Sequence, residues 1–136
     1  MKELRFHHIR YNIKFKNNDL ISMDLFPFDY VDEASIRTKS IYKSLRLEFH
    51  NKADRLRIKG LNSHLTEEAM MENYKTLYET YYNKLNQTLA KNNKKKGLIW
   101  GIENFRGGYY CLDSSYVYPL TRITFGKYDY PVGNNC

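Results

Sequence analysis

Three side chains in this sequence are suited to acid–base chemistry on a phosphodiester. Glu48 and His50 are two residues apart, and in a β-strand that spacing would place both on one face, about 6.6 Å from each other. His64 lies in the stretch Asn-Ser-His-Leu-Thr. A histidine and a carboxylate can serve as general acid and base, while Arg46 or Arg55 would hold the developing charge. Glu48, His50 and His64 are therefore the candidate catalytic residues if the protein is a metal-independent nuclease.

The remaining reactive residues do not predict a metal or a cofactor. His7 and His8 are adjacent and would point to opposite faces of a strand, and no Cys/His spacing typical of zinc is present. Arg106-Gly107-Gly108 lacks the flanking pattern of a phosphate-binding loop. The chain has two cysteines, Cys111 and Cys136, which are too few to stabilise a core by disulfide bonds. We expect no metal and no cofactor.

The balance of charge points to an anionic partner. The chain has 22 Lys and Arg against 15 Asp and Glu, a net charge of +7, and such an excess attracts polyanions. Several cations alternate with apolar residues, so they would share the open face of a sheet and could follow a phosphate backbone. These candidates are Arg10, Lys14, Lys16, Arg46, Arg55, Arg57 and Lys59. A solvated sheet face is the alternative interpretation.

A second cationic run and a group of tyrosines could add to such a surface. Lys94, Lys95 and Lys96 follow the predicted long helix; they could contact phosphate or an acidic protein surface, or form a solvated helix end. The chain has 13 tyrosines, and exposed rings can stack on bases or anchor an interface. The candidate aromatic contacts lie in the less regular last forty residues and are Tyr109, Tyr110, Tyr116 and Tyr118. Core packing is the alternative role for some of them.

The elements that would position these residues follow from hydrophobic periodicity. Two-residue alternation predicts hairpins at about 4–27 and 44–59, and a strand-like, tyrosine-rich region predicts a third at 98–125. Three- and four-residue spacing predicts a long amphipathic helix at about 66–92, and a shorter helix is expected at 32–43. The predicted fold is α+β: one antiparallel sheet built from the hairpins, with both helices packed on one face. We expect residues 1–136 to form a single compact domain, with 131–136 as a tail.

Length and composition limit the class of protein. No stretch reaches the roughly 18–20 apolar residues that span a bilayer, and the N-terminal residues are too charged for a signal peptide, so we expect a cytoplasmic protein without a membrane partner. Frequent Lys, Asn, Ile and Tyr residues, which have A/T-rich codons, are typical of an A/T-biased genome, such as that of a phage, a plasmid or a low-G+C bacterium. For a viral origin the location would be the host cytoplasm.

Three functions follow from these observations. The leading hypothesis is a non-enzymatic protein that contacts nucleic acid or a nucleoprotein surface through the cationic sheet face. The alternative is an inhibitor, encoded by a phage or mobile element, that acts on a host protein or defence complex by protein–protein interaction. The second alternative is the small nuclease described above. An apolar patch or open edge in the tyrosine-rich segment would leave room for a homodimer.

Overall fold

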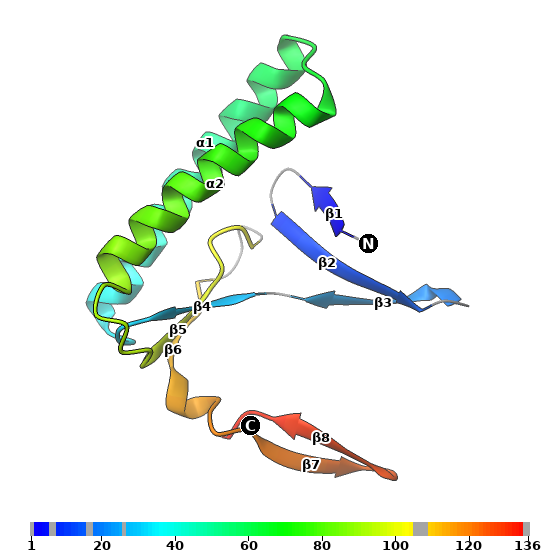
Figure 1. Cartoon of the computed structure of the whole chain (residues 1–136), viewed down its shortest axis with the longest axis vertical. Coiled ribbons are helices and arrows are strands. Elements are labelled where there is room, and N and C mark those ends of the chain that lie inside the picture. Colours follow the sequence, from blue (N-terminus) through cyan, green and yellow to red (C-terminus); the bar gives the residue numbers. More distant parts are fainter. Residues whose placement is uncertain (1, 6–7, 16–17, 26, 105–108, 135–136) are drawn as a thin grey trace.

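The computed structural model describes residues 2–5, 8–15, 18–25, 27–104 and 109–134, with side chains from residue 27 onward. Its elements are β1 (Lys2–Arg5), β2 (His8–Phe15), β3 (Asn18–Leu25), β4 (Phe28–Val31), α1 (Ile36–Asn62), α2 (Glu67–Leu89), β5 (Gly97–Trp100), β6 (Cys111–Asp113), the 3-10 turn η1 (Ser114–Tyr116), β7 (Thr121–Phe125) and β8 (Tyr128–Val132). The strands form three antiparallel sheets, β1-β2-β3, β4-β5-β6 and β7-β8 (Figure 1). The fold is broadly α+β, as the sequence predicts, but the prediction of a single sheet is wrong.

Residues 44–59, predicted as the second hairpin, lie inside α1. The buried residues Leu45, Phe49 and Ala53 recur every four positions, as on one side of a helix, whereas Leu47 is 44% exposed. Over so short a stretch, a helix with charged flanks also produces a two-residue alternation. The sheet-face geometry proposed for the cations of this segment is therefore wrong.

Two long helices replace the predicted short and long pair. α1 has 27 residues and begins after Ser35, whose hydroxyl accepts the backbone N–H of Thr38 at 3.1 Å. α2 lies where the sequence predicts a helix, and the Thr66 hydroxyl accepts the N–H of Ala69 at 3.2 Å. Side-chain capping of this kind satisfies N–H groups that have no partner within the helix.

The core lies between the helix pair and one face of the β4-β5-β6 sheet. Figure 1 shows the helices over the sheet at one end and extending past it at the other. Val31 and Ile99 face the helices from the sheet and are fully buried. The Phe49 ring packs edge-on against Tyr74 and Tyr81 at centroid distances of 5.7 and 5.8 Å. Tyr74 and Tyr81 of α2 thus fill part of the core.

The strands outside the helices differ from the prediction in their pairing. The N-terminal hairpin is present as β2 and β3, with Ile13 opposite Met23. The segment 98–125 is not one hairpin, because β5 pairs with β6 while β7 pairs with β8 across a two-residue turn. Gly126 in that turn has a φ of +65°, which glycine adopts without steric cost, so local pairing is favoured. β8 extends to Val132.

Candidate nucleic-acid interface

The loop between α2 and β5 carries four lysines and is held in one conformation by a buried aspartate. We call residues 91–96 the lysine loop; it contains Lys91, Lys94, Lys95 and Lys96. The Asp32 carboxylate accepts the backbone N–H groups of Asn92 at 3.0 Å and of Lys94 at 3.1 Å. Burial raises the pKa of Asp32, but these hydrogen bonds outweigh it and hold the pKa below its usual value. A charged Asp32 therefore fixes the loop.

A serine fixes the other end of the lysine loop. The Ser114 hydroxyl donates to the carbonyl oxygen of Lys95 at 3.1 Å, and the Ser114 N–H donates to that of Lys96 at 2.8 Å. Asn93 and Lys95 have φ values of 53° and 55°, a left-handed conformation that needs such support in a residue with a side chain. The sequence alone leaves a solvated helix end as an alternative for this run; in the structure the run lies in a loop with these backbone contacts, and its lysine side chains are exposed.

Two exposed aromatic rings lie beside the lysine loop. Tyr30 of β4 and Tyr118 stack with ring centroids 6.4 Å apart and planes 28° from parallel, and both rings are close to half exposed. The Lys95 ammonium lies 5.7 Å from the centroid of the Tyr30 ring, within cation–π range. The neighbouring Tyr118 hydroxyl raises the pKa of Tyr30. We call Tyr30, Tyr118 and Lys95 the stacking site.

Only part of the predicted aromatic set reaches this surface. Tyr118 belongs to the stacking site, and Tyr116, in η1, is 56% exposed. Tyr110 is also 56% exposed, and its ring packs edge-on against Trp100 at 5.0 Å. Tyr109 lies against α1, with its ring 6.5 Å from that of Tyr42. Sequence reasoning missed Tyr30, for which the strand signal is only partial: Phe28 and Tyr30 alternate with Asp29, but Val31 comes between Tyr30 and Asp32.

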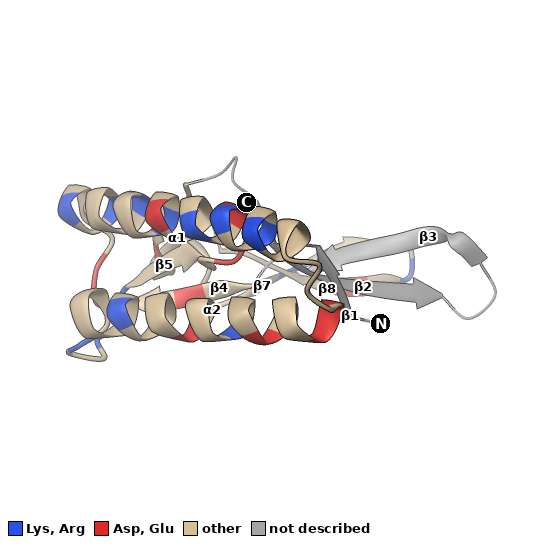
Figure 2. Ribbon diagram, turned by 90° about the horizontal axis from the view of Figure 1, so that it is seen from above, with Lys and Arg blue, Asp and Glu red and all other residues tan. Residues whose placement is uncertain are grey.

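In helix α1 the cations that the sequence analysis placed on one sheet face lie on different sides of the helix. α1 contains eight Lys and Arg and two Asp and Glu, and Figure 2 shows this excess as blue along the helix. At 3.6 residues per turn, Arg55 and Lys59 share one flank, and Arg57 lies on another. Arg57 is half-buried. The structure describes the backbone but not the side chains of Arg10 and Lys14, and Lys16 lies outside the described residues.

Arg46 is fully buried, so it is not part of any surface. Its Nη1 donates to the Tyr42 hydroxyl at 2.8 Å, and its Nη2 donates to the carbonyl oxygen of Asn104 at 2.9 Å. The guanidinium also lies 5.3 Å from the centroid of the Trp100 ring and 5.5 Å from that of Tyr109. Hydrogen bonds and ring faces compensate a charge that would be costly to bury alone. Arg46 thus holds the turn that follows β5 in place through its hydrogen bond to Asn104.

Two carboxyl groups lie near this buried arginine. Burial raises the pKa of Glu103 to about 7 and that of Asp29 to about 6. Glu103 is 5% exposed, and its Oε2 atom has no hydrogen-bond partner among the residues that the structure describes. The cluster has a cation and two acids, but in the described part of the chain no three His, Cys, Asp or Glu side chains could hold a metal ion.

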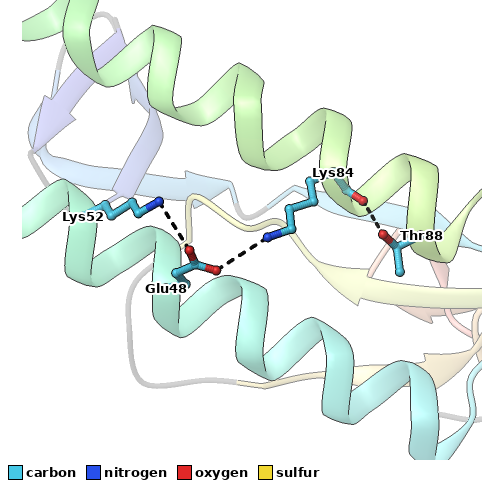
Figure 3. Close-up of polar contacts among 4 residues, drawn as sticks. All are labelled: Glu48, Lys52, Lys84 and Thr88. Atoms are coloured by element: carbon cyan, nitrogen blue, oxygen red, sulfur yellow. Dashed lines mark hydrogen bonds and ion pairs between the residues drawn. The ribbon is translucent and has the colours of Figure 1, made fainter.

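The three candidate catalytic residues do not form a site. Glu48 forms an ion pair with Lys52 within α1 at 3.3 Å and one with Lys84 of α2 at 3.7 Å (Figure 3). His50 is 1% exposed and packs against Phe49. Two residues along a helix differ in direction by about 200°, so the prediction that Glu48 and His50 share a strand face is wrong. His64 is exposed in the connection between α1 and α2, with a φ of 50°.

Comparison with known proteins gave no match to a family model, a curated protein or a solved structure. Among the described residues no helix is long and apolar enough to cross a membrane.

Proposed function

We propose that this protein binds single-stranded nucleic acid at the lysine loop and the stacking site. The observation that supports this best is the contact of the Lys95 ammonium with the exposed Tyr30 ring, which itself stacks on Tyr118. It brings together two features that the sequence analysis singled out separately, the run of lysines and a C-terminal tyrosine. Neither was predicted to lie beside the other.

The chemistry of the two parts is complementary to a single strand. Aromatic rings stack on bases with little sequence preference, at about 1–3 kcal/mol per base. Lysines beside them neutralise phosphates and release counterions. Because bases in a duplex are already stacked on each other, only a strand with unpaired bases can use the Tyr30 and Tyr118 faces. The lysine loop is pre-ordered by Asp32 and Ser114, so little conformational entropy is lost on binding.

The test is fluorescence anisotropy with labelled single-stranded DNA and RNA and with the matching duplex. We expect the wild type to prefer the single strands. Tyr118→Ala should weaken binding about tenfold, as expected for the loss of one stacked base. Phe125→Ala is the control, since Phe125 is an exposed aromatic residue on the separate β7-β8 hairpin.

The salt dependence tests the role of the lysines. Replacing both Lys94 and Lys95 by glutamine should reduce the slope of log K against log salt by roughly 1.4, about 0.7 for each lost contact with a single strand. Lys75→Gln, at an exposed position of α2, should change it much less. Equal affinity for duplex and single strand, or a Tyr118→Ala variant that binds as wild type, would reject the proposal. A protein partner that survives nuclease treatment of a pull-down would favour the inhibitor hypothesis instead.

A further inference from the structure

A small cavity opens between the start of α1 and the lysine loop. Its volume is about 180 Å³, and three cations from different parts of the chain line it: Arg37, Lys91 and Lys94. Two acids, Asp32 and Glu33, also line it. Both oxygens of Asp32 already accept backbone N–H groups of the loop. The cavity therefore offers more free donors than free acceptors.

The acids of the cavity neutralise its three cations only in part, because Asp32, which attracts Lys94, also accepts two backbone N–H groups. Within the part of the chain that the structure describes, no ion pair is recorded for Arg37, Lys91 or Lys94. Three cations against two acids leave the lining with an excess of one positive charge, which an anion bound in the cavity would offset. An arginine fork and two ammonium groups are donors suited to phosphate oxygens.

The size of the cavity limits the ligand. Sites for drug-sized ligands begin at roughly 300 Å³, so a cavity of about 180 Å³ is too small for a whole nucleotide. It has room for a phosphoryl group. A terminal phosphate monoester carries about −1.5 to −2 charges at pH 7, so a lining with an excess of positive charge attracts it more strongly than the single charge of an internal diester.

The cavity and the stacking site meet at consecutive residues. Lys94 lines the cavity, and Lys95 lies over the Tyr30 ring. Consecutive Cα atoms are about 3.8 Å apart, so one short loop segment contributes a residue to each site. We infer that the cavity binds the terminal phosphate of the nucleic-acid strand, an inference that rests on the proposed function. The protein would then recognise phosphorylated ends of single strands.

The experiment compares oligonucleotides of one sequence that differ only at their ends. Anisotropy titrations would use a 5′-phosphate, a 3′-phosphate and hydroxyl ends at both positions. We expect one phosphorylated form to bind at least fivefold tighter than the hydroxyl form. Arg37→Gln and Lys91→Gln should each abolish that ratio. In Arg37→Gln, whose residue lies in α1 and outside the lysine loop, the affinity for hydroxyl ends should stay within about twofold of wild type.

Lys96→Gln is the matched control, since Lys96 lies in the same loop but does not line the cavity. It should weaken binding of all three oligonucleotides equally and keep the ratio. If the wild type binds all ends with equal affinity, the inference is overturned and the proposed function stands. If it binds no oligonucleotide, the proposed function fails and the inference fails with it. If both Arg37→Gln and Lys91→Gln keep the ratio of affinities for phosphorylated and hydroxyl ends, another part of the protein recognises the end, and the inference is also overturned.

Discussion

Replacing Glu103 by glutamine removes a buried carboxyl group that makes the stability of the protein depend on pH. Glu103 is 5% exposed, and burial raises its pKa from 4.5 to about 7. In the unfolded chain the group ionises near its ordinary value, so the folded state binds more protons between these two pKa values. The contribution to stability is complete below about pH 4.5 and is lost as the pH rises through 7.

The size of the effect follows from the shift. One pKa unit corresponds to about 1.36 kcal/mol, and roughly two units of the shift lie between pH 5 and pH 7. Between pH 5 and pH 8 the wild type should therefore lose about 2.5 kcal/mol of unfolding free energy through Glu103. Asp29, with a pKa of about 6, adds a loss of the same sign. Glu48, Asp32 and Asp113 have lowered pKa values, so their contributions change below this window.

The assay is urea unfolding followed by circular dichroism at pH 5 and pH 8. Glu103→Gln leaves the contribution of Asp29 in place, so the difference between the pH dependences of wild type and variant isolates Glu103. We expect the variant to lose about 2.5 kcal/mol less than wild type over this range. Glu72→Gln, which removes an exposed carboxylate from α2, should leave the pH dependence as in wild type.

Parallel pH dependences of wild type and Glu103→Gln would refute the reasoning. They would mean that Glu103 stays ionised in the folded protein, with Arg46 as its counter-ion. The measurement therefore also decides how the buried arginine is compensated.

Two further substitutions test the packing and the loop. Gly97→Ala should destabilise the protein by about 3 kcal/mol, near the upper end for overpacking, because the new Cβ would lie 2.7 Å from the backbone carbon of Glu33. Gly101→Ala should lower the unfolding free energy less in the same urea titration, because the nearest atoms to its Cβ belong to the side chain of Glu103. Asp32→Asn should release the lysine loop, because a neutral amide accepts the N–H groups of Asn92 and Lys94 less strongly. Hydrogen exchange at these two amides should then be faster and oligonucleotide binding several-fold weaker, and unchanged exchange would contradict the role given to Asp32.

The sequence predicts α2 well because its signal extends over many turns. Tyr74, Tyr81, Leu85 and Leu89 keep one phase, and all four are buried. In α1 the same signal is interrupted by the buried Arg46, which sequence reasoning assigns to the surface. The two-residue alternation therefore predicts a hairpin at 44–59 in place of the helix, and this error also misplaces every cation of that segment.

The candidate site was only partly predictable for a different reason. The lysines and Tyr118 can be singled out by residue type, but their proximity depends on pairing between distant segments. Tyr30 of β4 reaches the lysine loop because β4 pairs with β5, which the loop precedes. The side chain that orders the loop, Asp32, is 60 residues from Asn92 in the chain. No local pattern encodes contacts over such a separation.

The β7-β8 hairpin has a consequence for how the molecule opens. All its strand residues are exposed except Val132, which is half-buried, and an isolated two-stranded hairpin has little stability of its own in water. Its separation therefore uncovers almost none of the core between the helices and the β4-β5-β6 sheet. The hairpin should open as an independent low-energy unit while the rest stays folded, and a protease that samples such openings would cut there first.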